Sequence, residues 1–247
     1  MNPLLISGHK SHKGLVRENN EDALYANDKI GVYILADGMG GHQGGEIASN
    51  IAVNTIAKIL SSSVMEPQMK NLGEIIYNSL DEANKEIILH RKNDTNLMNM
   101  ATTIVISIFI DDVVNYIHLG DSRAYLYNKN DNLKQLTTDD SLVMEMVKQG
   151  IISKDEARMH SLRNIVTRYL GSVRLSIPQV QKYTVGTYDC IILCSDGLTN
   201  MLDDKEILSI LRSNISLGPQ VVCNLLVESA NTKGGEDNIS VIIVQNK

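Results

Sequence analysis

Short apolar runs rich in β-branched residues recur along the chain and are separated by turn-forming residues, a pattern typical of β-strands. The pattern predicts strands at residues 4–7, 23–26, 31–36, 102–109, 113–118, 123–127, 179–184, 190–194 and 239–244. Several of these runs are apolar throughout, which indicates strands that are buried on both faces.

Apolar residues at helical spacing occupy the stretches between groups of strands. The spacing predicts two pairs of long helices, at residues 44–61 and 72–91 and at 203–213 and 219–230. Asp203 suits a helix cap and Pro219 suits a first helical turn. Clusters of strands broken by paired helices favour sheets covered by helices over strict βαβ alternation.

A more polar stretch at about residues 138–172 interrupts the series of strands, and helices are predicted in it at 141–149 and 153–160. We expect this insertion to form a flap. The chain has the length of one large domain and contains no obvious linker, so we predict a single domain over residues 1–247 that carries this flap.

Composition narrows the class of protein. The net charge of −6 argues against a general surface for nucleic acid or anionic membrane. The cysteines Cys190, Cys194 and Cys223 show no CxxC spacing and are expected to be small buried hydrophobic residues in a reducing, cytoplasmic setting. The sequence shows no apolar run of membrane-spanning length and no apolar leader, so neither a membrane span nor a signal peptide is predicted.

Four aspartates lie at the ends of predicted strands, each beside glycine: Asp37, Asp121, Asp196 and Asp237. A carboxylate in such a position is costly to bury unless a positive charge neutralises it. The repeated pattern therefore predicts one shared oxygen-ligand site for hard divalent cations. The alternative for each aspartate taken singly is an ordinary turn residue.

Two further segments carry candidate chemistry. Arg17 precedes Glu21 and Asp22, and its guanidinium offers a fork of donors that matches phosphate oxygens. The glycine-rich segment 36–46 leaves room for backbone carbonyls to face a cation. This segment is neither a Rossmann fingerprint, because Gln43 replaces the third glycine, nor a Walker loop.

Five ordered motifs resemble those of the metal-dependent protein serine/threonine phosphatases of PP2C type (PPM family), and of their bacterial branch most closely. The resemblance runs from about Gly8 to Val244 and rests on Gly14-x-x-Arg17-x-x-Asn20-Glu21-Asp22, Ala36-Asp37-Gly38-Met39-Gly40-Gly41-His42, Gly120-Asp121-Ser122-Arg123, Ser195-Asp196-Gly197-Leu198-Thr199 and Gly235-Glu236-Asp237-Asn238. The segment Asn164 to Gly171 resembles the end of the family's flap.

The resemblance implies an α+β fold, a four-layer αββα sandwich of two antiparallel sheets flanked by helices. It also implies two Mn²⁺ or Mg²⁺ ions bridged by Asp37, with the Gly38 carbonyl as a further ligand. Asp196 and Asp237 are implied as ligands of the other ion, and Glu21 as a ligand acting through water.

Arg17 is implied as the residue that binds the substrate phosphate. Asp121, together with Asp196, is implied as the ligand set of a third, weaker divalent metal next to the flap, to which Asn164 adds a carbonyl. Met39 stands where eukaryotic relatives carry a histidine proposed as general acid, and His42 is a candidate substitute; the alternative for His42 is a helix-start histidine that only hydrogen-bonds.

The implied reaction is hydrolysis of phosphoserine and phosphothreonine in proteins by attack of a metal-bridging water, since two cations lower the pKa of such a water and screen the phosphoryl charge. The implied partners are phosphorylated proteins, including a Hanks-type kinase and its substrates, and the protein is expected to be a monomer. Two other classes of protein are alternatives: a binding module that recognises phosphoproteins without hydrolysis, and a receiver-like phosphoacceptor. The expected metal carboxylates are present, which disfavours the first, and no central parallel sheet with a partner lysine is evident for the second.

The chain departs from the family pattern at two further positions. Ala101 replaces a glycine before the pair Thr102-Thr103, which we interpret as a structural change. Asp140 follows Asp139 where many bacterial members have histidine. This change is expected to affect the flap or the affinity for metal and not the main site.

Overall fold

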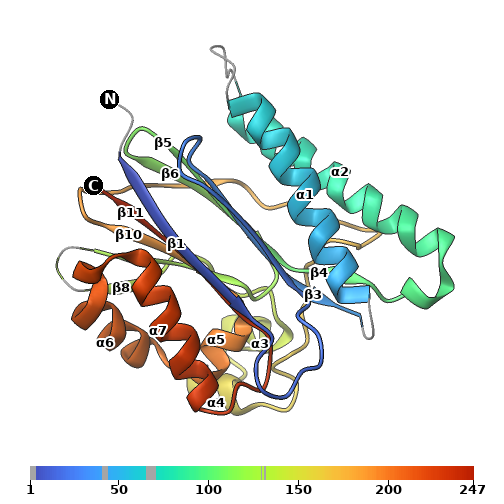
Figure 1. Cartoon of the computed structure of the whole chain (residues 1–247). Helices are drawn as coiled ribbons and strands as arrows, with labels where there is room; N and C mark the ends of the chain where they lie inside the picture. Colours follow the sequence, from blue (N-terminus) through green and yellow to red (C-terminus); the bar gives the residue numbers. More distant parts are fainter. Residues whose placement is uncertain (1–3, 41–43, 65–70, 129, 131) are drawn as a thin grey trace.

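The computed structural model describes residues 4–40, 44–64, 71–128, 130 and 132–247 (Figure 1). The strands are β1 (Leu5–His12), β2 (Asp22–Asn27), β3 (Val32–Met39), β4 (Ala101–Thr102), β5 (Ile104–Ile110), β6 (Val113–Leu119), β7 (Arg123–Tyr127), β8 (Leu133–Gln135), β9 (Gln181–Thr184), β10 (Cys190–Cys194) and β11 (Ile239–Asn246). The helices are α1 (Gly44–Val64), α2 (Leu72–Asn93), α3 (Leu142–Lys148), α4 (Lys154–Met159), α5 (Asp196–Met201), α6 (Asp204–Asn214) and α7 (Pro219–Thr232), with short 3₁₀ turns at Thr95–Leu97 and Ile215–Leu217.

The strands form two antiparallel sheets. One sheet has the order β1-β11-β10-β7-β8, and the other has the order β2-β3-β5-β6-β9 with β4 paired to the end of β3. Both sheets therefore contain strands from distant parts of the sequence. The ends of β3, β6 and β10 and the start of β11 can then meet at one edge of the two sheets.

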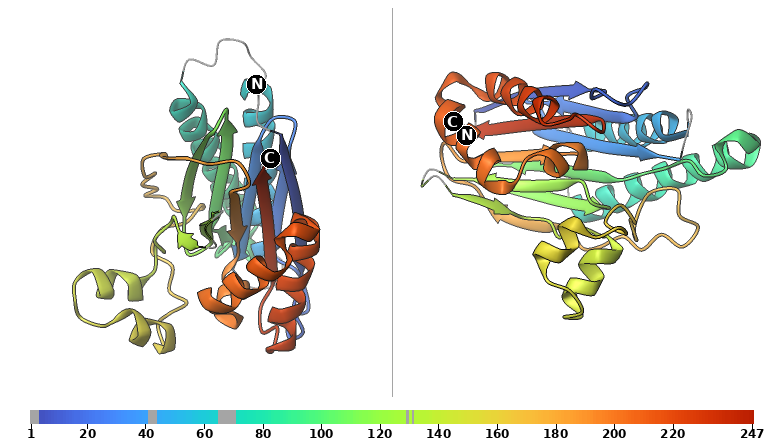
Figure 2. Two further views of the ribbon diagram at one scale, coloured as in Figure 1. Left: turned by 90° about the vertical axis from the view of Figure 1, so that its left-hand side faces the viewer. Right: turned by 90° about the horizontal axis from the view of Figure 1, so that it is seen from below.

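Three hydrophobic cores separate four layers. The first lies between α1, α2 and the β3 sheet, the second lies between α5, α6, α7 and the β11 sheet, and the third lies between the two sheets. Strand β3 shows why its sequence is apolar throughout: Ile34 packs toward the helices while Tyr33 and Leu35 pack toward the other sheet. The predicted four-layer αββα sandwich is confirmed (Figures 1 and 2).

Most predicted elements are present, and the helix caps are those expected. Asp203 caps α6 with a full capping box to Glu206, and Pro219 begins α7. The predicted strand over 102–109 is wrong in one respect, because it is interrupted at Thr103, although β4 and β5 pair with β3 in the same register on either side of it. The prediction also ended the first strand at residue 7, although β1 continues to His12 by pairing with β11.

Two short elements escaped prediction because they lack a hydrophobic period. Strand β8 has only three residues, and α5 is a six-residue helix that follows directly on a buried strand. Asp37, expected just beyond a strand, lies within β3.

Residues 138–172, here called the flap segment, leave the sandwich and return to it, as Figure 2 shows for the yellow helices α3 and α4. Their caps, Ser141 and Ser153, were expected as the starts of these helices. In the part of the chain that the structure describes, no helix has both the length and the apolar character needed to cross a bilayer.

Candidate functional site

The predicted site residues converge on one cavity of about 290 Å³. The residues that line it are Arg17, Glu21, Asp37, Gly38, Met39, Gly40, Thr103, Asp121, Asn164, Val166, Asp196 and Asp237. Every predicted metal or phosphate residue that the structure describes is in this set. His42, the candidate general acid, lies outside the described residues.

Strand geometry directs Asp37 into the space between the sheets, because alternate residues of a strand share a face and Tyr33 and Leu35 occupy that face. The backbone around Asp37 is held by Thr103, whose hydroxyl accepts from the Asp37 N–H at 3.0 Å and whose N–H donates to the Asp37 carbonyl at 2.9 Å. These bonds involve only main-chain atoms of Asp37. Its carboxylate is therefore left to face the cavity.

Glycine is required where β3 meets the start of α1. A Cβ atom on Gly38 would lie 2.1 Å from the Gly45 carbonyl oxygen, and a Cβ atom on Gly45 would lie 2.2 Å from a carboxylate oxygen of Glu21. The close approach of these backbones brings Glu21 beside Asp37 at the cavity wall. The glycine-rich segment thus serves packing around the carboxylates.

Asp237 and Arg17 are held together by the loop before β2. The Arg17 guanidinium donates to Asp237 at 2.7 Å, and the Asn238 amide donates to the carbonyls of Lys13 and Asn19. Asn238 also accepts from the Glu21 N–H at 2.7 Å. One asparagine beside Asp237 therefore fixes the loop that carries both Arg17 and Glu21.

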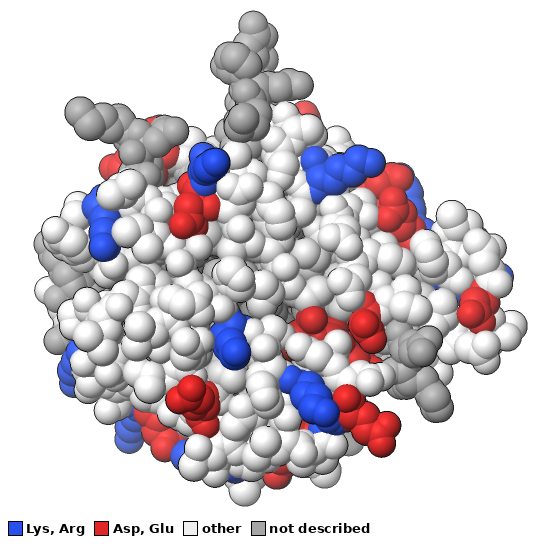
Figure 3. Space-filling view, viewed as in Figure 1, with Lys and Arg blue, Asp and Glu red and all other residues white. Residues whose placement is uncertain are grey.

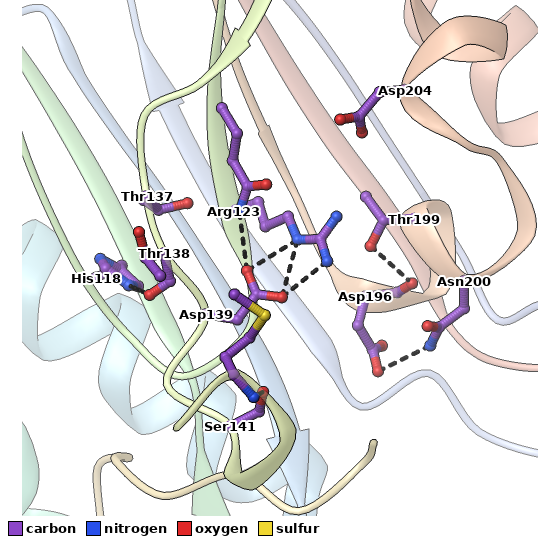
Figure 4. A network of polar contacts seen from close by, with 12 residues as sticks. His118, Arg123, Thr137, Thr138, Asp139, Ser141, Asp196, Thr199, Asn200 and Asp204 are labelled. Carbon is purple, nitrogen blue, oxygen red and sulfur yellow. Dashed lines mark hydrogen bonds and ion pairs between the residues drawn. The ribbon is translucent and has the colours of Figure 1, made fainter. Parts of the chain in front are cut away.

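Asp196 is the first residue of α5, directly after the buried strand β10. Its carboxylate accepts from the Asn200 side chain at 3.1 Å (Figure 4). The preceding Ser195 donates its hydroxyl proton to Asp22 at 2.9 Å, and Asp22 lies directly opposite Asp37 across β2 and β3. A buried acid is thus placed behind the cavity.

Burial and mutual repulsion set the protonation of these acids. Burial, together with neighbouring carboxylates, raises the pKa of Asp22 to about 7 and that of Asp121 to about 8. The pKa of Asp37 is well above its ordinary value, first because of burial and then because of repulsion by Asp22 and Asp196. Burial likewise raises the pKa of Glu21, against the opposing effect of the Arg17 charge.

Such a concentration of partly buried acids fits a divalent cation, which would neutralise the charges that the protein leaves unbalanced. The donors are all oxygen atoms, as hard cations prefer, and one carboxylate oxygen of Asp22 is buried without a hydrogen-bond partner. Across the described residues, no group of three or more His, Cys, Asp or Glu side chains has an arrangement that could hold a metal ion. Asp237 and Asp196 instead accept hydrogen bonds from Arg17 and Asn200.

A partly buried ion pair flanks the cavity on the side of the flap segment. Arg123 donates to both carboxylate oxygens of Asp139, at 2.7 to 3.1 Å (Figure 4). It also donates to the hydroxyl of Tyr125 at 2.9 Å. Its positive charge lowers the pKa values of Asp121 and Asp196 against the larger effect of burial. Arg123 is thus a partly buried cation close to the acids of the site.

Several residues that shape the site were not among the predicted site residues. Thr103, Asn200 and Asn238 orient carboxylates, and Asp22 supplies the buried acid behind them. Each of the last three lies within or just after a quoted motif, so position in the motif was an available signal. Thr103 belongs to the pair Thr102-Thr103 of the family pattern, and that pair was the signal available for it.

Comparison with known proteins gives a consistent result. The family model described as protein phosphatase 2C matches residues 10–228. The serine/threonine phosphatase stp of Listeria innocua is 37% identical over 241 residues, which cover 96% of this chain and 94% of that protein.

Solved structures agree over nearly the whole length. The crystal structure of the Mycobacterium tuberculosis serine/threonine phosphatase PstP/Ppp superposes with a TM-score of 0.89 at 31% identity, covering 98% of this chain and 99% of that one. A structure of the PstP catalytic domain in complex with two manganese ions has a TM-score of 0.86 at 31% identity, covering 98% and 97%. Match length, identity and the convergence of the motif residues lead to one conclusion: this chain belongs to the protein phosphatase 2C family.

Proposed function

We propose that the cavity is the active site of a metal-dependent phosphatase that hydrolyses phosphoserine and phosphothreonine in proteins. The observation that carries this proposal is the convergence of Arg17 with the carboxylates of Asp37, Asp121, Asp196 and Asp237 on one cavity. Phosphate-ester hydrolysis needs residues that bind the phosphate and groups that neutralise its charge, and the lining of this cavity offers residues for both.

We assign the metal ligands as follows. Asp37 would be a ligand shared by two Mn²⁺ or Mg²⁺ ions, the Gly38 carbonyl would add to one of them, Asp196 and Asp237 would hold the other, and Glu21 would act through water. When bound, two such ions supply positive charge for the phosphoryl oxygens and lower the pKa of a water held between them. The relative with two bound manganese ions supports a dinuclear site.

Asp121 and Asp196 are proposed for a third, weaker divalent ion. Both line the cavity, and the pKa of Asp121 is raised by burial and then by the charge of Asp196. Asn164, from the flap segment, lines the same cavity and is the candidate for an additional oxygen ligand.

Arg17 is assigned to the substrate phosphate. Its side chain is 52% exposed at the cavity wall, so its guanidinium is accessible to an incoming phosphate. A planar guanidinium donates two parallel hydrogen bonds to phosphate oxygens, which fixes the orientation of the ester. Asp237 holds this guanidinium in place from the other side. His42 stays our candidate for the general acid.

The remaining proposals concern the biological setting. We propose that residues 1–247 act as one monomeric, cytoplasmic domain that opposes a Hanks-type kinase by dephosphorylating the kinase and its substrates. Nucleic acid is not proposed as a partner. The net charge is −6, and the described residues on the face in Figure 3 show acidic and basic side chains interspersed, without a continuous basic surface.

The test is hydrolysis of p-nitrophenyl phosphate and of a phosphothreonine peptide by the purified protein, with Mn²⁺ and with Mn²⁺ plus excess chelator. The proposal expects turnover of both substrates that depends on Mn²⁺ and is lost with chelator and in Asp196→Asn. Binding of the phosphopeptide without turnover would instead indicate a recognition module. Near-normal turnover by folded Asp196→Asn would refute the dinuclear assignment.

A further inference from the structure

The flap segment has little core of its own. Within it, Val143 and Ala157 are buried, whereas Ile151 and Met159 are 60% and 85% exposed. Helices α3 and α4 pack mainly on each other and stand away from the sandwich (Figure 2). The position of such a segment depends on the contacts at its base.

The two ends of the flap segment meet at Asp140. The Asp140 carbonyl accepts from the Thr167 N–H at 2.7 Å, and Ser141 pairs with Val166 as an isolated antiparallel bridge. One carboxylate oxygen of Asp140 lies 3.4 Å from the Arg168 guanidinium. Both a main-chain bond and an ion pair therefore join the start of the flap segment to its end.

The same residue also binds the sandwich. The Asp140 N–H donates to the Gly120 carbonyl at 2.9 Å, and the Gly120 N–H donates to the Asp140 carboxylate at 3.2 Å. Gly120 directly precedes Asp121, which lines the cavity. His118 completes the surroundings: its Nε2 lies 3.9 Å from the Asp140 carboxylate and, because its nearer partner at 2.9 Å is the Thr138 carbonyl, this nitrogen carries a proton.

The adjacent Asp139 points to a different partner, since its carboxylate binds Arg123 on β7 of the other sheet (Figure 4). Consecutive aspartates thus attach the base of the flap segment to both sheets. The two attachments differ in one respect. Among the described residues, the Asp139 carboxylate accepts from Arg123 and Gln135 of the sandwich, whereas Asp140 also contacts Arg168, two residues beyond the cavity-lining Val166.

We propose that Asp140 is a positioning residue whose ion pair with Arg168 holds the flap wall of the cavity in place, and that this contact favours phosphoprotein substrates over small phosphate esters. The inference rests on the proposed phosphatase function. A cavity of about 290 Å³ holds a phosphorylated side chain, so the flanking residues of a protein substrate must contact the rim. Asn164 and Val166 form the flap side of that rim. Binding of a small aryl phosphate depends instead on Arg17 and on the carboxylates that line the cavity, Asp37, Asp121, Asp196 and Asp237.

The test compares p-nitrophenyl phosphate with a phosphothreonine peptide, both with Mn²⁺. The variants are Asp140→Asn, which keeps an acceptor for Gly120 and removes the charge, Arg168→Met, and their combination. Arg168→Lys is the conservative variant, because a single contact at 3.4 Å needs a cation and not a fork. The matched control is Asp155→Asn, an exposed carboxylate on α4 of the same segment.

We expect Asp140→Asn and Arg168→Met each to raise KM for the peptide about five- to tenfold, with less than about twofold change in kcat/KM for p-nitrophenyl phosphate. The double variant should be no worse than either single variant because one contact is lost in all three. Arg168→Lys should stay near the parent, and limited proteolysis within the flap segment should be faster only in the three variants that lose the contact.

Equal changes on both substrates, or no change on the peptide in folded Arg168→Met, would overturn the inference. Arg168 is partly exposed, so this variant keeps the test valid even where Asp140→Asn disturbs folding. A parent protein that hydrolyses neither substrate would overturn the proposed function and this inference with it. An active parent with unselective variants would overturn the inference alone.

Discussion

The substitution Asp37→Asn should separate two effects of the Asp37 carboxylate: it lowers the free energy of unfolding, and it is required for hydrolysis. Asp37 is partly buried opposite Asp22, and burial and neighbouring acids raise its pKa well above the ordinary value. Asparagine has nearly the same shape, and the hydrogen bonds that hold this position involve main-chain atoms of Asp37. We therefore expect the variant to fold and to lose hydrolysis by at least about 100-fold.

The effect on stability has a sign that follows from the pKa shift. A carboxyl with a raised pKa in the folded state contributes most at pH below its unfolded pKa, and this contribution is lost as pH rises toward the folded pKa. Asparagine does not ionise, so the stability of the variant should increase relative to that of the parent as pH rises above the ordinary aspartate pKa of 3.8. Opposed strand residues lie about 5 Å apart, and at an effective dielectric constant of about 20 one like-charge pair costs roughly 3 kcal/mol.

In excess chelator near pH 8, we expect the free energy of unfolding of Asp37→Asn to exceed that of the parent by roughly 3 kcal/mol. Near pH 5 the difference should be much smaller. Urea denaturation measures both values. Saturating Mn²⁺ should reverse the order, because the parent binds the ion better. The exposed control Asp155→Asn should change neither value. A chelated variant less stable than the parent at both pH values would refute this electrostatic reasoning.

Three further predictions follow from the same geometry. Arg17→Lys should lower kcat/KM for a phosphothreonine peptide at least about tenfold because the fork of donors is lost, and parent-like kinetics would contradict the phosphate assignment. Gly14→Ala should lower the free energy of unfolding, measured by urea denaturation, by about 1–3 kcal/mol and should also lower the phosphatase activity. The reason is that Gly14 has φ of +79° and a Cβ atom there would lie 2.2 Å from the Asp237 carbonyl oxygen. A variant as stable and as active as the parent would contradict this prediction. The affinity for Mn²⁺ should increase between about pH 6 and 8, with release of protons, because burial and neighbouring carboxylates raise the pKa of Asp22 to about 7 and that of Asp121 to about 8. Calorimetry in two buffers of different ionisation enthalpy measures the number of protons released. An affinity for Mn²⁺ that is independent of pH would contradict this prediction.

The sequence was sufficient to predict the layers and the carboxylate wall. Strand β3 is apolar on both faces, so its apolar run predicted a buried strand. Because side chains alternate along a strand, Asp37 lies on the face that packs against the other sheet. The interruption at Thr103 could not be predicted, because it depends on the partner strand: Thr103 lies opposite Asp37, and its side-chain hydroxyl accepts from the Asp37 N–H. Pairing between distant strands is invisible in a local pattern.

The partners of the site acids were equally hidden. Arg17 was predicted for phosphate, yet its contact within the protein is Asp237, 220 residues further along the chain. Asp22 carries no local sign of how deeply it is buried, since its partner Ser195 comes from the other sheet. The departure at Asp140 was noticed in the sequence, but its role at the base of the flap segment required the positions of Gly120 and Arg168.

The most direct test of the central assignment is anomalous diffraction from crystals of the protein soaked in Mn²⁺. We expect two manganese ions about 3.5–4 Å apart, both within ligand distance of Asp37, with Asp196 and Asp237 on one of them. Manganese bound elsewhere, or a single ion that Asp37 does not contact, would contradict the account.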